Sequence, residues 1–139
     1  MSQKNIYHRG DEFRLQVMLR NPSEKDVYVF GTLDWGYSAS LMFHIRDSKG
    51  KEIVPREVPD TPPVAPPVDK SAYVKLRPDH FLGTSYFAPV KVVNLTMPGK
   101  YSIFAEYRCP FPRADVPVSP FWGHEEGIVK SNVVYVELK

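Results

Sequence analysis

The stretch from Cys109 to Gly123 holds the side chains best suited to binding a partner. It combines aromatic rings with charged side chains, and four prolines restrict its backbone. Rings supply apolar contact area, a guanidinium group donates hydrogen bonds to a carboxylate or a carbonyl, and prolines lower the entropy lost on binding. The residues in and next to this stretch that we predict to bind are Arg108, Phe111, Arg113, Phe121 and Trp122. The alternative is that these aromatic rings fold back and cap one end of the core.

A second aromatic segment lies earlier in the chain, at Asp34-Trp35-Gly36-Tyr37. Trp35 and Tyr37 are suited to stacking on a sugar ring, a proline-rich peptide or a side chain of a partner protein. The interpretation that we favour for Trp35 is a plug in the core, because a buried Trp near an early strand is common in β-sandwiches. We expect the Trp35 and Trp122 loops to lie at the same end of the fold.

Three histidine-containing segments carry side chains of the types that bind metal ions. His124-Glu125-Glu126 lacks the second histidine, four residues on, that a zinc-binding helix needs, and His8 and Asp79-His80 add no regular spacing. No calcium-binding loop of the Asp-x-Asp-x-Asp-Gly type is present. We therefore predict solvated charges in turns, with no metal and no cofactor.

The candidate nucleophiles lack the sequence context of an enzyme. Ser38 and Ser40 follow Gly36, but the second glycine of a nucleophile elbow is missing. Cys109 precedes a proline and belongs to no motif of a thiol enzyme, so we predict a partly buried structural cysteine. The eight glycines are scattered singly and form no phosphate-binding loop. The sequence predicts a protein that is not an enzyme.

Composition limits the kinds of partner. Basic and acidic residues, 18 and 16 in number, are mixed along the 139 residues, which makes nucleic acid a poor candidate. The apolar runs are far shorter than the roughly 20 residues of a membrane-spanning helix, so we expect no membrane insertion. One cysteine leaves the compartment open, and we favour export, with any signal peptide removed, over the cytoplasm.

The elements that position these residues are predicted to be short strands. Apolar and polar residues alternate from Phe13 to Arg20 and again from Leu41 to Ile45, as in strands with one buried face. No apolar pattern with helical spacing persists for ten residues. Further strands are predicted at 27–30, 51–54, 72–76, 84–95 with a break at Pro89, 101–107 and 133–138.

Two turns and a proline-rich segment connect these strands. Asp47-Ser48-Lys49-Gly50 has the composition of a hairpin turn. In Met97-Pro98-Gly99-Lys100-Tyr101 the glycine supplies a positive φ, and the tyrosine hydroxyl can bond back to the corner that precedes it. The segment from Pro55 to Asp69 carries six of the 14 prolines and is predicted to cross the surface as a stiff connection.

Together these features predict one all-β domain over residues 1–139, an immunoglobulin-like Greek-key β-sandwich of seven or eight strands with little or no helix. Lys49 and Lys51 resemble the charges that protect an edge strand, which favours a monomer over a dimer formed through strand edges.

The order of these pieces resembles the bacterial immunoglobulin-like domains typified by the intracellular proteinase inhibitor family. The matching segments are residues 19–27, 43–53 and 98–101. The resemblance implies the sandwich fold and assigns no functional residue.

The function that we predict is a non-catalytic binding or accessory module that presents its aromatic and proline-rich loops to a protein or carbohydrate partner. The first alternative is a proteinase or hydrolase inhibitor that acts through residues 109–123. The second alternative is a small hydrolase.

Overall fold

The computed structural model describes residues 5–36, 39–55, 65–89 and 95–139, and these residues form an all-β fold. This confirms the predicted fold class. No α-helix occurs among them, and the helical segments are the single 3-10 turns η1, η2 and η3 at Lys70–Ala72, Arg113–Asp115 and His124–Glu126. The strands are β1 (Ile6–Tyr7), β2 (Glu12–Arg20), β3 (Val27–Phe30), β4 (Leu41–Asp47), β5 (Glu52–Ile53), β6 (Tyr73–Leu76), β7 (Phe81–Pro89), β8 (Gly99–Tyr107), β9 (Val129–Lys130) and β10 (Val134–Leu138).

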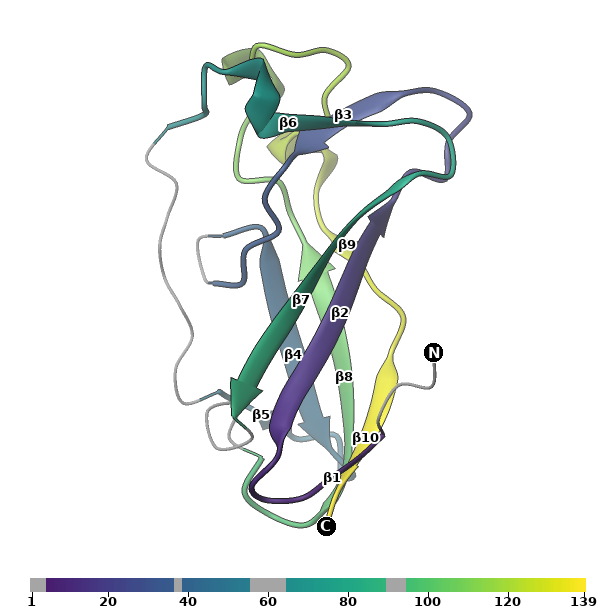
Figure 1. Cartoon of the computed structure of the whole chain (residues 1–139), viewed down its shortest axis with the longest axis vertical. Helices are drawn as coiled ribbons and strands as arrows, with labels where there is room; N and C mark the ends of the chain where they lie inside the picture. Colours follow the sequence, from purple (N-terminus) through teal and green to yellow (C-terminus); the bar gives the residue numbers. More distant parts are fainter. Residues whose placement is uncertain (1–4, 37–38, 56–64, 90–94) are drawn as a thin grey trace.

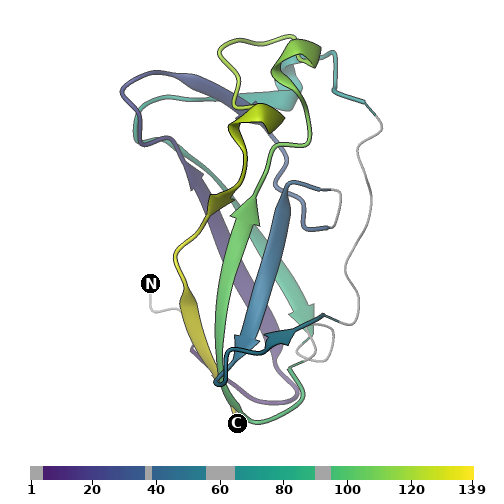
Figure 2. The same ribbon diagram turned by 180° about the vertical axis from the view of Figure 1, so that it is seen from behind.

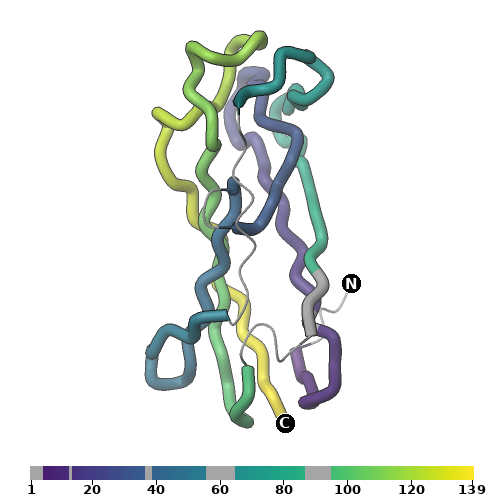
Figure 3. The backbone as a smooth tube through the Cα atoms, turned by 90° about the vertical axis from the view of Figure 1, so that its left-hand side faces the viewer, coloured from purple at the N-terminus to yellow at the C-terminus, as the bar shows by residue number. Residues whose placement is uncertain are grey.

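The strands lie in two layers (Figures 1, 2 and 3). The larger sheet has the order β1-β10-β8-β4-β5, with β9 paired to the end of β8. Its pairs are antiparallel except for β1 and β10, which run parallel. The second layer consists of β2 and β7, which pair over nine residues each. Figure 3 shows the two layers from the side.

The second layer bends at one end and continues as a second pair of strands. β2 leads into β3, β6 leads into β7, and β3 pairs with β6. The backbone stays paired at the bend, where the Asn21 N–H donates to His80 O (3.0 Å) and Asn21 O accepts from the Asp79 N–H (2.8 Å). Pro22 and Pro78 have no N–H to donate, so the regular ladder stops there. The β3–β6 pair therefore lies across the end of the larger sheet where β4 begins and β8 ends (Figure 1).

The main core lies between the two layers and follows the alternation seen in the sequence. Leu15 of β2, Phe43 and Ile45 of β4, and Tyr101 and Ile103 of β8 are buried, while Arg14 and Gln16 are exposed. These residues belong to one apolar cluster. The alternating pattern thus placed the inward faces of β2, β4 and β8 correctly.

A second core cluster lies under the β3–β6 pair and has a different origin. It combines residues from the bent ribbon with residues from the connection after β8. Its buried members are Leu33, Leu41, Tyr73, Tyr107, Cys109, Phe111 and Phe121. Because the larger sheet ends at Tyr107, this cluster covers its end.

Both predicted turns form as expected. The Asp47 carboxylate accepts from the Lys49 and Lys51 backbone N–H groups at 2.9 Å, and Gly50 has φ +79°. The Tyr101 hydroxyl donates to the Met97 carbonyl oxygen at 2.5 Å, and Gly99 has φ +151°. The corner bond fixes the start of β8.

Several predictions need adjustment at their boundaries. Ten strand segments form, more than the seven or eight predicted, because β1, β5 and β9 contain only two residues each. β7 begins at Phe81 instead of Thr84 and ends at Pro89, where the break was predicted. Tyr37, Ser38, most of the segment from Pro55 to Asp69 and residues 90–94 lie outside the described residues.

Candidate functional site

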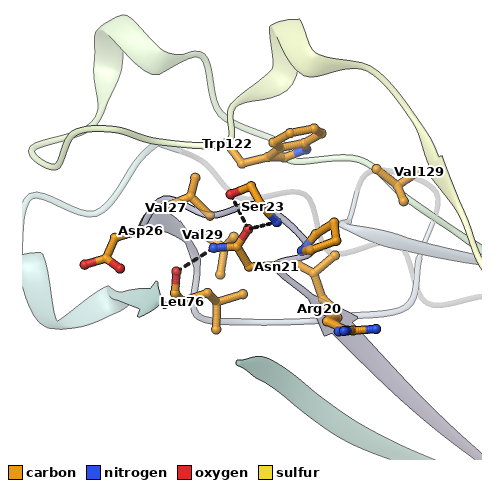
Figure 4. Close-up of a pocket in the computed structure, with 11 residues that line it drawn as sticks. Arg20, Asn21, Ser23, Asp26, Val27, Val29, Leu76, Trp122 and Val129 are labelled. Carbon is orange, nitrogen blue, oxygen red and sulfur yellow. Dashed lines mark hydrogen bonds between the residues drawn. The ribbon is translucent and has the colours of Figure 1, made fainter. Parts of the chain in front are cut away.

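A pocket of about 410 Å³ lies beside the bend of the second layer. We call it the Trp122 pocket, because the indole of Trp122 lies along one side of it (Figure 4). Its lining comes from the end of β2, from the bend, from β3 and β6, and from the segment between Trp122 and β9. The lining residues are Leu19, Arg20, Asn21, Pro22, Ser23, Asp26, Val27, Val29, Leu76, Trp122 and Val129.

Asn21 holds the polar side of this pocket together. Its Nδ2 donates to Lys25 O (2.8 Å) and to Leu76 O (2.9 Å), and its Oδ1 accepts from the Ser23 N–H (3.0 Å) and hydroxyl (2.8 Å). These four contacts use the full capacity of the amide, which has two donors and two acceptor lone pairs. Asn21 is 4% exposed, so these bonds also satisfy a polar group that is costly to bury. Three of these contacts, two with Ser23 and one with Leu76 O, are drawn as dashed lines in Figure 4.

The charged side chains at the pocket also have partners. The Arg20 guanidinium lies 2.7 Å from the Asp79 carboxylate, and the Asp26 carboxylate lies 3.8 Å from the Lys75 ammonium. Both pairs are exposed to solvent, so each adds little to stability. The pocket therefore presents apolar walls next to the polar side chains of Arg20, Asn21 and Asp26, which already have partners within the protein, and Trp122 Nε1 is its one buried side-chain donor without a partner among the described residues.

Trp122 reaches the pocket because its backbone extends the β3–β6 pair. The Tyr28 N–H donates to Pro120 O (2.8 Å), and the Trp122 N–H donates to Tyr28 O (2.9 Å). These two bonds make the segment around Phe121 a second strand-like neighbour of β3, on the edge away from β6. Phe121 then points into the core and Trp122 toward the pocket, as expected for consecutive residues in extended backbone.

Three residues of the connection after β8 cap the core. Phe111 and Phe121 are 3% and 4% exposed, and their rings meet Phe30 and Tyr73 edge to face at centroid distances of 4.9 and 5.5 Å. Cys109 is 0% exposed, more buried than predicted, and its burial raises the pKa of the thiol. Phe111 and Phe121 thus take the positions given by the alternative stated in the sequence analysis, in which the aromatic rings of this segment cap the core.

The two arginines predicted to bind lie on the surface of the same connection and contact their neighbours. Arg108 Nη2 donates to His124 Nε2 (2.9 Å). Arg113 contacts Glu126 (3.2 Å) and Glu125 (3.8 Å), and its backbone N–H donates to the Glu125 carboxylate. Backbone N–H groups of Glu125 and Arg113 and the Arg113 charge hold the pKa of Glu125 below its ordinary value.

Trp35 lies at the same end of the larger sheet but in the other core cluster. The antiparallel pairing of Leu41 with Tyr107 brings the start of β4 beside the end of β8, so the Trp35 and Trp122 loops share one end, as predicted. The Trp35 ring meets Phe43 at 5.4 Å and Tyr86 at 6.5 Å, both edge to face. The structure places Trp35 as a partly buried plug.

The histidines form no metal site in the described part of the chain. No three His, Cys, Asp or Glu side chains gather there closely enough to hold a metal ion. Each helical segment described is one 3-10 turn, so none has the length or the apolar character to span a bilayer.

The sequence prediction identified Trp122 and missed the rest of the pocket. Asn21, Leu76 and Val129 were given no role, although residues 27–30 were predicted as a strand. The signal at this corner is the Asn21-Pro22 pair, which precedes the apolar run 27–30 by four further residues. Comparisons of the chain with models of protein families, with curated proteins and with solved structures gave no match.

Proposed function

We propose that this protein is a non-catalytic binding module that holds an apolar side chain of a partner protein in the Trp122 pocket. The observation that supports this most directly is the combination of apolar walls with the side chains of Arg20, Asn21 and Asp26, which already have partners within the protein. A pocket of about 410 Å³ lies within the range usual for ligand sites. Leu19, Val29 and Trp122 offer a ligand apolar surface, and an aromatic wall is typical of the residues that dominate binding energies.

A protein side chain suits this pocket better than a sugar. Sugar hydroxyls need several hydrogen-bond partners, and the Asn21 amide already makes four bonds within the protein. Arg20 and Asp26 are likewise paired with Asp79 and Lys75. An apolar group gains from leaving water without needing such partners.

The strand order supports an immunoglobulin-like sandwich as the scaffold for this module. The order β1-β10-β8-β4-β5 facing β2 and β7, and the bond from the Tyr101 hydroxyl to Met97 O, are features that such sandwiches share. Loops at one end of such sandwiches are frequent binding sites, and the Trp122 pocket lies at one end.

An inhibitor acting through residues 109–123 has less support. The aromatic rings of that segment at Phe111 and Phe121 are inside the core, and Arg113 contacts Glu125 and Glu126. A loop inserted into a hydrolase needs free side chains at its tip, and the exposed part of this segment is limited to residues 112–115, which include the η2 turn, and to residues 119–120.

The test uses peptides selected from a random display library for binding to the folded wild-type protein. The selection contains no competing ligand, so it does not favour peptides that bind the pocket. Dissociation constants are then measured by calorimetry for four proteins. We expect the wild type and Val68→Phe to bind alike, because Val68 is 91% exposed and remote from the lining. We expect Val129→Phe, which fills the pocket from its exposed rim, and Trp122→Ala, which removes one wall, to bind at least about tenfold more weakly, about 1.4 kcal/mol.

Peptides that bind Val129→Phe as well as the wild type would refute the proposal, and so would a selection that enriches no peptide. Circular dichroism and thermal unfolding of each variant establish that it is folded before its affinity is compared. Val129 is itself partly exposed, so the larger ring enters the pocket without displacing a core residue.

A further inference from the structure

β2 has one edge that no described residue covers. It pairs only with β7, and in Figure 1 it is the outermost strand of its layer on the side away from β7. At the bend, the backbone N–H and C=O of Asn21 point toward the β7 side, where they bond to His80 and Asp79. Backbone groups alternate in direction along an antiparallel strand, so Gln16 and Met18 direct theirs away from β7. These two residues offer an incoming strand a row of donors and acceptors.

A second hollow, of about 140 Å³, lies beside this open edge. It lies between Leu15–Met18 of β2 on one side and residues 131–134 on the other, with Phe43 and Ile103 among its lining. The Trp122 pocket follows it along the same strand, because Leu19 and Arg20 line that pocket and Val129 lies opposite them. The two hollows thus lie one after the other between β2 and the segment from Trp122 to Val134.

We propose that the partner binds as an extended peptide that adds to the open edge of β2. This proposal rests on the function proposed above, because the same peptide places an apolar side chain in the Trp122 pocket. An extended strand directs alternate side chains to opposite faces. Every second side chain of the peptide therefore faces the hollow beside Val17 and then the pocket, while its backbone bonds to Gln16 and Met18.

The solvent-facing side of β2 indicates the other half of the peptide's composition. Glu12, Arg14, Gln16 and Arg20 are exposed there, and Arg20 already contacts the Asp79 carboxylate at 2.7 Å. Side chains on directly facing strand positions interact, so polar residues of a peptide suit these positions. The peptide that fits this edge alternates apolar residues with polar ones.

A second copy of the chain fits this edge poorly. Residues 131–134 line the hollow directly across from Leu15–Met18. If two copies paired through their β2 edges, the 131–134 segments of both copies would lie on the same side of the joined sheet. Both segments would then lie next to the two-fold axis and meet each other. A single peptide strand brings no such layer, so it can occupy the edge without collision.

Amide hydrogen exchange tests this binding mode, with the selected peptides as probes. In the free protein we expect the Gln16 and Met18 amide protons to exchange fast, and in the complex at least about tenfold more slowly, because they become hydrogen-bonded. The matched controls are Gly83 and Ser85, whose backbone groups point to the opposite edge of the ribbon by the same alternation. Their exchange should not change when the peptide binds.

Two substitutions at Met18 distinguish the contribution of its backbone N–H to peptide binding from the contribution of its side chain. Met18→Pro removes the donor on the open edge, a position where an edge strand tolerates proline, whereas Met18→Ala keeps the donor and shortens a side chain that is 67% exposed. We expect Met18→Pro to weaken the peptide at least about tenfold and Met18→Ala less than about threefold. If Met18→Pro does not fold, the exchange measurement still decides.

Three outcomes would overturn the strand-addition proposal. If a peptide depends on Trp122 and Val129 while the Gln16 and Met18 amides stay fast, the pocket binds and the strand does not add. If concentration alone protects these amides and sedimentation shows a dimer, the occupant is a second copy. If no peptide binds at all, the function proposed for the pocket fails together with this inference.

Discussion

Trp35 and Trp122 are the two tryptophans of this protein, and they lie at the same end of the larger sheet in different surroundings. Both are partly buried, and the Nε1 atom of each is buried without a hydrogen-bond partner in the described part of the chain. Trp35 packs between Phe43 and Tyr86 in the cluster between the layers. Trp122 packs on the second cluster and lines a pocket.

The difference comes from what lies next to each ring. Both layers supply neighbours to Trp35, since Phe43 belongs to β4 and Tyr86 to β7. Trp122 follows Phe121 in a segment that pairs with β3, and beyond it the ribbon bends away at Asn21. The bend leaves a hollow that no described side chain fills. The path of the backbone thus decides the role of each tryptophan. The bend makes Trp122 the wall of a pocket, whereas Trp35 fills the core.

The comparison predicts unequal losses of stability when each ring is removed. Trp35→Ala leaves a cavity between the two layers and should lower the free energy of unfolding by about 3 kcal/mol. Trp122→Ala removes a ring that already borders a hollow and should cost about 1.5 kcal/mol. Urea denaturation monitored by circular dichroism measures both. Equal losses would contradict the distinction between a plug and a pocket wall.

The bend itself should be the next most sensitive feature. Asn21→Ala leaves the Leu76 carbonyl without this donor in a mostly buried corner and removes one of the two side-chain donors to Lys25 O, and should cost about 2 kcal/mol. Ser23→Ala is the matched control, because it removes an exposed hydroxyl that contacts the same amide and the Lys25 backbone, and it should cost less than about 1 kcal/mol. A neutral Asn21→Ala variant would show that the corner keeps its shape without this amide.

The sequence predicted the main core well and the second cluster poorly, for a physical reason. Alternation in β2 and β4 is a local property, so it indicates which face of each strand is buried before any partner is known. The burial of Phe111 depends on whether the β3–β6 pair lies over it, and that pair forms between segments far apart in the chain. Composition alone could not distinguish a binding loop from a cap.

The pocket was missed for the same reason. Its walls belong to four segments that meet only because Tyr28 bonds to the backbone of Pro120 and Trp122. The four-bond network of the Asn21 amide also requires Leu76 O, which comes from a strand far away in the sequence. Local patterns therefore predict elements here, and long-range backbone pairing produces the site.

Cys109 offers a probe of how tightly the second cluster closes behind the pocket. Burial raises the pKa of its thiol above the ordinary 9.0, so the native thiol should react with a disulfide reagent at pH 8 at least about tenfold more slowly than in the unfolded chain. The neutral thiol is the form favoured by folding. This contribution to stability is therefore complete below pH 9 and is lost as the pH rises through the pKa of the folded state.

The control for this experiment is Ser48→Cys in the Cys109→Ala background. Ser48 lies in the exposed hairpin turn, so its replacement should react at the rate of an unfolded cysteine. If native Cys109 reacts equally fast, the second cluster opens readily, and the pocket next to Trp122 extends deeper than the structure shows.

The pKa of Tyr86 reports on how well the core around Trp35 excludes water, because the Tyr86 ring packs against Trp35. Burial, followed by the negative charge of Asp34, raises its pKa to about 12. Asp34→Asn removes the smaller of these two causes and should lower the pKa of Tyr86, which stays above its ordinary value because burial still acts. The measurement is the absorbance change at alkaline pH, taken as the difference between each protein and its Tyr86→Phe counterpart.

Because the neutral phenol of Tyr86 is the form favoured by folding, its contribution to stability is lost as the pH rises through this pKa. Ionisation of Tyr86 near its ordinary value of 10.0 in the wild type would mean that water reaches the Trp35 cluster. The two tryptophans would then differ in their neighbours but not in their access to solvent.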